Sequence, residues 1–148
     1  MDRLILSLLV SVVGCASTNG LESSLNHVEV ESWETVDPAE MNTEITGALA
    51  EGEEWPRSPL AATVQLLGGD TDAQTLQLEE HRSNPEGVYM VIVVLVRDGF
   101  LGDSVRGDWH RIAYESQPDG TWRIRSVQRA FRCYRGHHKE SFSREWCL

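Results

Sequence analysis

Val88-Tyr89-Met90-Val91-Ile92-Val93-Val94-Leu95-Val96 is the stretch of sequence that decides the fold of this chain. It is apolar on both faces of an extended strand, which is typical of a strand that other parts of the chain cover on both sides. An edge strand of this composition would invite aggregation, and so short a segment cannot cross a membrane as a helix. We therefore expect a central strand with a helix on one face and another part of the chain on the other.

Weaker strand signals lie on either side of this stretch. Residues 75–79 alternate polar and apolar side chains, and residues 84–87 have the composition of a turn. Residues 109–115 and 122–131 are two further strand candidates, and residues 117–120 between them carry a hairpin signal. These segments predict an antiparallel meander of four strands.

The last of these strands changes face along its length. Trp122 and Ile124 share one parity, whereas Val127 and Phe131 share the other. A bulge inserts one extra residue into a strand and so exchanges the two faces. We therefore expect a bulge near Ser126.

Two helices are expected before the strands. Asp37 has the chemistry of an N-cap and Gly52 that of a stop, with an apolar stripe between them. Ser58 and Gly68 delimit a second, shorter helix in the same way. The stripe of the first helix consists of Met41, Ile45, Ala48 and Leu49. The fold class that follows is α+β, with one or two N-terminal helices packed on a four-stranded antiparallel curved sheet.

The chain begins with a short apolar run, residues 4–13, preceded by Arg3 and followed by Gly14. As a helix this run would be about 15 Å long, half of the roughly 30 Å that a bilayer core requires. The segment therefore targets the protein and does not span a membrane. We expect residues 1–14 to be a cleavable signal peptide. The alternative is an N-terminal helix buried in the domain.

The end of this run, Val12-Val13-Gly14-Cys15, resembles the lipobox of bacterial lipoproteins. The resemblance implies a diacylglycerol thioether on Cys15 and a third acyl chain on its new amino group, which together hold a protein on a membrane. It also implies a location in the bacterial cell envelope, and Ala16 favours the outer membrane, facing the periplasm. Residues 15–32 would then be a lipidated tether, with an irregular strand near Val28 and Val30, and residues 33–148 a single α+β domain.

Two cysteines remain once Cys15 carries lipid. In an oxidising compartment we expect Cys133 and Cys147 to form a disulfide that staples the C-terminal tail to the domain. A disulfide that closes a loop of about 15 residues stabilises the folded state by roughly 3 kcal/mol. The alternative is a zinc or redox-responsive site formed by these cysteines with His137 and His138, although the spacing is not that of a zinc finger.

Charge is distributed unevenly along the chain, whose net charge is −10. Residues 1–104 carry 4 basic and 18 acidic side chains, whereas residues 105–148 carry 9 basic and 5 acidic ones. We expect the two halves to pair within the molecule. The alternative is an external anionic partner, a lipid head group or a glycan, because nucleic acid is a poor partner for an acidic protein. The arginines available for either role are Arg123, Arg125, Arg129, Arg132 and Arg135.

The C-terminal third carries a second resemblance. Residues 103–107, 120–124, 132–137 and 146–148 look like the signature of a group of small bacterial proteins, with a tryptophan strand, an Arg-Cys, a Gly-His and a closing cysteine. The resemblance implies a fold similar to the cystatin-like or nuclear transport factor 2 superfamily, in which a curved sheet cradles a helix. It carries no catalytic residues.

Candidate site residues form three sets. We expect His110 to lie on the exposed side of its strand. The alternative is an acid/base cluster of His110 with Asp103, Arg106 and Tyr114 inside a cone-shaped sheet. Tryptophans at strand positions are more often core than pocket, which applies to Trp109, Trp122 and Trp146. The binding-surface candidates are Arg132, Arg135, His137 and His138, unless they form a solvated loop paired with Glu140 and Glu145.

Three functions compete on these grounds. The first is a lipid-anchored envelope protein with a non-enzymatic binding or assembly role, whose partners are the membrane and another envelope protein or an anionic lipid or glycan. The second is a small-molecule binder or enzyme of the cone-shaped superfamily. The third is a zinc or redox-responsive envelope protein. We expect no cofactor and, under the first hypothesis, no metal.

Overall fold

The computed structural model of the chain describes residues 28–68, 72–83, 89–102 and 104–148. The expected signal peptide, Cys15 and most of the tether therefore lie outside the described residues. The expected turn at residues 84–87 and the candidate Asp103 lie outside them as well.

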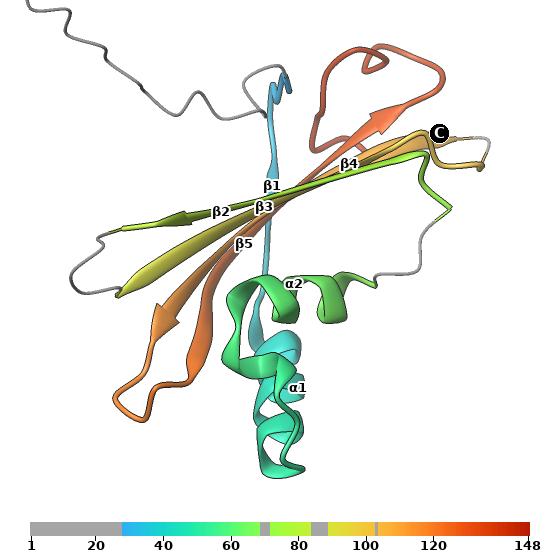
Figure 1. Cartoon of the computed structure of the whole chain (residues 1–148). Coiled ribbons are helices and arrows are strands. Elements are labelled where there is room, and N and C mark those ends of the chain that lie inside the picture. The colour runs from blue at the N-terminus through green and yellow to red at the C-terminus, as the bar shows by residue number, and fades with distance from the viewer. Residues whose placement is uncertain (1–27, 69–71, 84–88, 103) are drawn as a thin grey trace, which may run out of the picture.

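The described residues form two α-helices, a short 3-10 helix and a five-stranded antiparallel sheet (Figure 1). The helices are α1 (Ala39–Ala50), η2 (Trp55–Arg57) and α2 (Pro59–Leu67). The strands are β1 (Glu34–Val36), β2 (Thr75–Arg82), β3 (Met90–Asp98), β4 (Val105–Ser116) and β5 (Trp122–Cys133), in the spatial order β1-β5-β4-β3-β2. The expected α+β class is confirmed.

The expected count of four strands is wrong, because β1 pairs with β5 and adds a fifth strand at that edge of the sheet. In register, Glu34 lies opposite Arg129 and Val36 opposite Val127. The strand expected near Val28 and Val30 is reduced to one isolated bridge, between Val30 and Phe142. A strand of only three residues with two polar side chains carries too little periodicity to be detected in the sequence.

Both helix starts agree with the capping chemistry of the sequence. The amide of Ala61 donates to Oγ of Ser58 at 3.3 Å, so Ser58 is the N-cap of α2. Asp37 accepts from the amide of Ala39 at 3.0 Å, although α1 begins one residue later than expected, with Pro38 in the cap position. Such a shift of one residue is within the ordinary uncertainty of helix ends.

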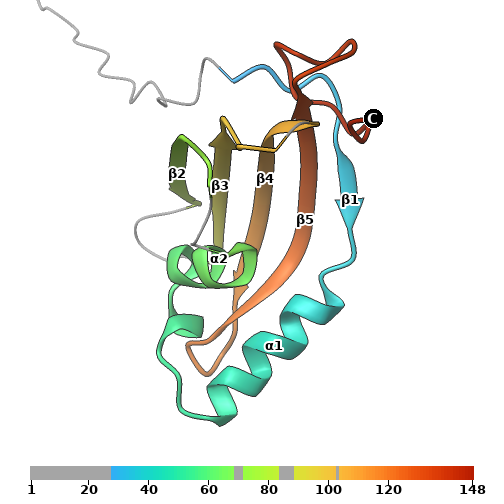
Figure 2. The ribbon, with the colours of Figure 1, turned by 90° about the vertical axis from the view of Figure 1, so that its right-hand side faces the viewer.

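The first core lies between the helices and the sheet (Figure 2). Ile45 of α1 and Ala62 of α2 pack on strand residues that are all buried and share one face, which we call the helix face. Since α1 and α2 cover only part of this face, the end of the sheet farther from α1 extends beyond them (Figure 2). The strand residues of this core are Val91, Val93, Ile112, Tyr114, Ile124 and Val127.

A second core lies on the opposite face of the sheet. Val96, Trp109 and Ala130 are buried there beneath Phe142, which comes from the C-terminal tail. Val28 and Val30 of the N-terminal segment and Val94 of β3 pack against the same cluster. The two-sided apolar character of β3 is thus explained by helices on one face and, on the other, by the segment that contains Val28 and Val30 together with the C-terminal tail. Coverage of β3 on both faces was expected.

The bulge expected near Ser126 is confirmed. Ala113 pairs with Ser126 and Tyr114 with Ile124, so Arg125 is the extra residue. Asn42 of α1 covers the edge of β5 beside this bulge, because its side-chain amide donates to the carbonyl of Ile124 at 2.9 Å and accepts from its amide at 2.8 Å. Of the helices in the described residues, none has the combination of length and hydropathy that crossing a bilayer requires.

Candidate functional site

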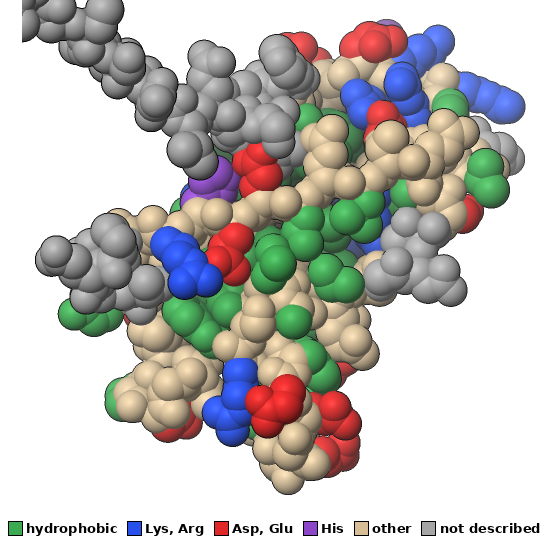
Figure 3. Space-filling view, in the orientation of Figure 1, with side chains coloured by type: hydrophobic (Ala, Val, Ile, Leu, Met, Phe, Trp, Pro, Cys, Tyr) green, Lys and Arg blue, Asp and Glu red, His purple; other side chains and the backbone are tan. Residues whose placement is uncertain are grey.

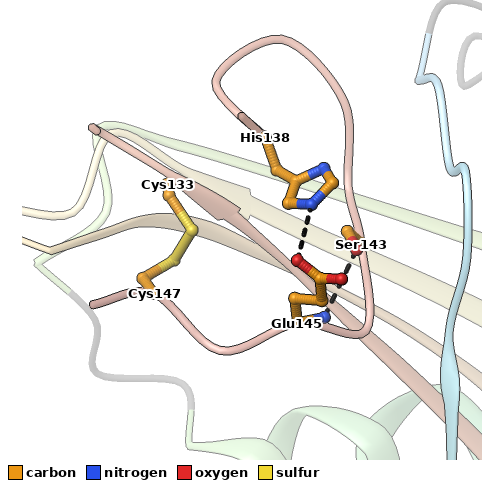
Figure 4. The surroundings of a disulfide bond; sticks show 5 residues. All are labelled: Cys133, His138, Ser143, Glu145 and Cys147. Atoms are coloured by element: carbon orange, nitrogen blue, oxygen red, sulfur yellow. Dashed lines mark hydrogen bonds and ion pairs between the residues drawn. A yellow bond between two sulfur atoms is a disulfide. The ribbon is translucent and has the colours of Figure 1, made fainter. Parts of the chain in front are cut away.

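The disulfide between Cys133 and Cys147 is present, as expected, and closes a loop between the end of β5 and the C-terminus (Figure 4). The two Cα atoms lie 5.5 Å apart. Because each sulfur is bonded to the other, neither is a thiolate that a zinc ion could use. The described residues also contain no group of three or more His, Cys, Asp or Glu side chains placed to hold a metal ion.

The C-terminal tail is bound to the N-terminal segment of the domain. Phe142 donates its amide to the carbonyl of Glu29 at 2.8 Å and accepts from the amide of Glu31 at 2.9 Å. The hydroxyls of Ser32 and Ser143 lie 3.1 Å apart. The residues at which the described chain begins therefore lie beside its C-terminal tail, at the end of the sheet that holds the disulfide. We call this region the disulfide end.

His138 connects the two segments through its side chain. Its Nε2 lies 3.0 Å from Oε2 of Glu145, and its Nδ1 lies 3.5 Å from Oε2 of Glu31 (Figure 4 shows the first contact). Its backbone carbonyl also accepts from the amide of Cys133 at 2.8 Å. His138, a predicted binding residue, is therefore part of the joint between the tail and the N-terminal segment.

Arg132, the second predicted binding residue, is also engaged within the molecule. Its Nη2 donates to Oδ2 of Asp98 in a short hydrogen bond, and its guanidinium lies 4.5 Å from the centre of the Phe142 ring. Asp98 also forms an ion pair with Arg106, at 3.5 Å between Oδ1 and Nε. Arg106 then donates to the carbonyl of Lys139 at 3.0 Å. This network ties β3, β4 and β5 to the tail.

A pocket of about 390 Å³ opens beside this network. It lies where the start of β2, the β3–β4 loop, the end of β5 and the C-terminal tail meet. Charged groups of both signs line it, namely Arg106 and Lys139 with Asp98 and Glu140. The pocket is polar, with no excess of either charge.

Arg135 and His137, the other two predicted binding residues, are exposed on the loop that follows β5. No side-chain partner is seen for Arg135, Lys139 or Arg144 among the described residues. In Figure 3 basic side chains gather at the upper right, over this part of the chain, with carboxylates among them. The structure therefore separates the four predicted binding residues into two that hold the fold together and two that face solvent.

The expectation that His110 lies on the exposed side of its strand is wrong. His110 is only 6% exposed, and its Nε2 lies 3.1 Å from Oδ2 of Asp108. Asp108 in turn receives two hydrogen bonds from Arg97, directly opposite it on β3. Burial raises the pKa of Asp108, but the hydrogen bonds from Arg97 and His110 outweigh it, so the pKa lies below the usual 3.8.

The candidate catalytic residues do not form one cluster. Tyr114 is fully buried against α2, where its hydroxyl lies 2.8 Å from that of Thr63, and burial raises its pKa to about 12. Arg106 lies in the polar pocket, which neither His110 nor Tyr114 lines. Asp103 is outside the described residues. In the described part of the chain, His110, Arg106 and Tyr114 therefore lie in different surroundings and do not form an acid/base cluster.

The tryptophans are also dispersed. Trp109 is buried on the face away from the helices, where Trp33 lies 6.5 Å from it between ring centres. Trp122 packs against the core under the helices. Trp146 is 64% exposed and contacts Phe131 edge-on, with ring centres 4.5 Å apart. The prediction that such tryptophans are core residues is thus wrong for Trp146, because the residue lies in the tail and not in a strand.

Arg97 is the residue of interest that sequence reasoning missed. Arg97 was detectable only from the register of β3 with β4, which places it opposite Asp108.

Comparisons of this chain with protein-family models, with curated proteins and with solved structures give no match.

Proposed function

We propose that this chain is a lipid-anchored protein of the bacterial cell envelope, with a binding or assembly role that is not enzymatic. The observation that carries the proposal is the sequence Val12-Val13-Gly14-Cys15 directly after an apolar run too short to span a bilayer. The acyl chains on Cys15 would provide the membrane attachment. Ala16 favours the outer membrane, with the domain in the periplasm.

The disulfide supports this location. Structural disulfides form and persist in oxidising compartments and are rare in the cytosol. Cys133 and Cys147 are paired with each other, which leaves Cys15 as the one cysteine available for lipid.

The arrangement of polar groups supports binding over catalysis. His110 and Tyr114 are buried and bonded to neighbouring side chains, as a structural role requires. The disulfide end instead exposes Arg135, His137 and Lys139, and Lys139 also lines the polar pocket. The partner classes that fit such a surface are another envelope protein and an anionic lipid or glycan.

We also propose that the fold is cystatin-like. Its support is the arrangement of α1 and α2 on one face of an antiparallel sheet in which β5 carries a bulge. A curved sheet that cradles a helix is what the similarity of the C-terminal third implies.

The test is the intact mass of the native protein extracted from the membranes of its host. The expected mass is that of residues 15–148 with three acyl chains on Cys15. A Cys15→Ser variant should keep its leader and gain no lipid, whereas a Ser17→Ala variant should be processed normally. A native protein that retains Met1 and carries an unmodified Cys15 would refute the proposal.

A further inference from the structure

We propose that the disulfide end of the domain docks directly on the surface of the bilayer that holds the lipid anchor. This inference rests on the proposed lipid attachment at Cys15 and extends it, because it assigns the face of the domain that contacts the membrane. Four observations carry it: exposed apolar side chains, unpartnered cations, an acidic opposite end and the position of the N-terminal segment.

Four of the eight exposed large apolar side chains among the described residues lie at the disulfide end. Leu101 is 74% exposed and Trp146 is 64% exposed, and Tyr134 and Leu148 are also exposed. Trp and Tyr are the residues enriched where proteins meet the interface of a membrane, since their rings are apolar and their tips are polar. Trp146 contacts Phe131 and Tyr134 is hydrogen-bonded to Phe100, but part of the apolar surface of each still faces solvent.

The segments that carry these side chains are joined to one another at this end of the sheet. The hydroxyl of Tyr134 donates to the carbonyl of Phe100 at 2.6 Å, next to Leu101. The amide of Tyr134 donates to the carbonyl of Ser104 at 3.0 Å, which fixes the β3–β4 loop beside the end of β5. The disulfide joins Cys133, which precedes Tyr134, to Cys147, which lies between Trp146 and Leu148. Three separate segments of the chain are thereby held together at one end.

Basic side chains lie on the same C-terminal segment as the exposed Tyr134 and Trp146. Arg135, Lys139 and Arg144 lie on the same tail, and the described residues provide no partner for their side chains. Glu140 and Glu145 lie nearby, so the charge of this end is close to balanced. Long basic side chains can place their stems on an apolar surface and their charge at a lipid phosphate.

The opposite end of the domain carries the excess negative charge. The helix α1 and the turn that follows it contain five glutamates. The arginines at this end are Arg57, in the same stretch of chain, and Arg123 and Arg125 of β5, which lie beside α1. Red side chains accordingly predominate at the bottom of Figure 3. An anionic membrane repels this end and not the disulfide end, which sets the orientation within a Debye length of the surface, about 8 Å at physiological salt. The glutamates are Glu40, Glu44, Glu51, Glu53 and Glu54.

The described chain begins at the disulfide end. In Figure 2 the N-terminal segment and the C-terminus lie together at the top, and α1 lies at the bottom. Glu29 and Glu31 are hydrogen-bonded to Phe142 at this end. A chain from Cys15 to Val28 can span at most about 45 Å even when fully extended. A lipid on Cys15 would therefore tether the domain by its disulfide end.

The test measures how close Trp146 lies to lipid. The lipidated protein is reconstituted in vesicles of phosphatidylcholine and phosphatidylglycerol whose acyl chains carry bromine, which quenches tryptophan fluorescence on contact. We expect quenching of the native protein and a loss of most of this quenching in Trp146→Phe. Acrylamide in the water should quench Trp146 less on vesicles than in unlipidated residues 15–148 with Cys15→Ser, produced without the leader and kept in solution.

Matched variants identify the docking face. Leu101 and Tyr89 are equally exposed, at 74% and 73%, but Tyr89 lies beside the start of β3, at the other end of the sheet. We expect Leu101→Ser to reduce the quenching by brominated lipid and Tyr89→Ser to leave it unchanged. The triple change of Arg135, Lys139 and Arg144 to Gln should reduce it only on vesicles that contain phosphatidylglycerol, and Arg123→Gln should not reduce it.

The two proposals fail in different ways. An intact mass without acyl chains refutes lipid attachment, and with it the docking. An acylated protein whose Trp146 is unquenched by brominated lipid and fully accessible to acrylamide refutes the docking and leaves the lipid anchor standing. Equal losses in Leu101→Ser and Tyr89→Ser would also refute the assignment of the docking face.

Discussion

The guanidinium of Arg97 binds both carboxylate oxygens of Asp108 across two neighbouring strands, with Nε 2.8 Å from Oδ1 and Nη2 2.5 Å from Oδ2. Both side chains are almost completely buried. A third hydrogen bond, 2.8 Å long, runs from Nη1 of Arg97 to the carbonyl of Leu67 at the end of α2. One arginine thus joins two strands and a helix.

Removal of one partner of this pair should destabilise the protein strongly. Arg97→Gln leaves a buried carboxylate without its counter-charge, and such changes cost about 3–5 kcal/mol. The matched control is Arg125→Gln, which breaks the exposed ion pair with Glu115 and should cost less than about 1 kcal/mol. Urea denaturation measures both free energies of unfolding. Equal effects would mean that the Arg97 pair contributes no more than a surface ion pair.

The same pair predicts a loss of stability in acid. Because the pKa of Asp108 is lowered in the folded protein, its contribution to stability is complete above the unfolded value and is lost as pH falls below 3.8 through the folded pKa. Asp108→Asn should be less stable at neutral pH and should lose less of its stability over this acidic range. Urea midpoints measured along a pH series test this, and parallel curves for the two proteins would contradict it.

Tyr114 predicts a loss of stability in alkali. Burial raises its pKa from 10.0 to about 12, and the folded state therefore retains a proton that the unfolded chain releases. The free energy of unfolding should consequently fall as pH rises from 10.0 to about 12. Tyr114→Phe should remove this dependence, at a cost of about 1 kcal/mol for the hydrogen bond with Thr63. Ultraviolet absorbance of the tyrosinate follows the titration, and ionisation of Tyr114 near 10.0 would contradict the prediction.

Asn42 should contribute more to stability than its position on a half-exposed helix suggests. Asn42→Ala leaves both backbone groups of Ile124 without their partners, which costs about 1–3 kcal/mol. Thr43→Ala on the same helix removes only an exposed hydroxyl bonded within the helix and should change stability by about 0.5 kcal/mol or less. Chemical denaturation of the two variants provides the comparison. A smaller loss in Asn42→Ala than in Thr43→Ala would mean that water replaces the amide.

The disulfide should stabilise the domain through its effect on the unfolded chain. The two cysteines are 14 positions apart, and a bridge that closes a loop of this size is worth about 3 kcal/mol. The double variant Cys133→Ala, Cys147→Ala should lower the free energy of unfolding by this amount, and reductant should then have no further effect on it. A thiol assay on the unfolded, unreduced protein should detect neither cysteine. Detection of two thiols would overturn the bridge.

The parts of this fold that the sequence predicts are those with local or strongly periodic signals. The apolar stretch that contains β3, the Ser58 cap and the change of parity in β5 each report a physical constraint within a few residues. The parts that it does not predict depend on distant partners. β1 is recognisable only through β5, and the burial of His110 follows from an aspartate on its own strand and an arginine on the next.

In the candidate site, too, the sequence predicts the features with a local signal and not those that depend on distant partners. The disulfide follows from counting cysteines, whereas the roles of Arg132 and His138 depend on Asp98, Glu31 and Glu145, which lie on other segments. The uneven distribution of charge along the sequence predicts that the acidic residues 1–104 pair with the basic residues 105–148. It does not predict which cations remain without partners.

The pairing of β1 with β5 has a consequence for the order of events during synthesis. Glu34 and Arg129 are 95 positions apart, and contacts of this separation form slowly because the intervening chain must first be ordered. The first strand has no partner until nearly the whole polypeptide has been made. A chain of this topology therefore completes the β1 edge of its sheet last, after β5 has been made and has paired with β4.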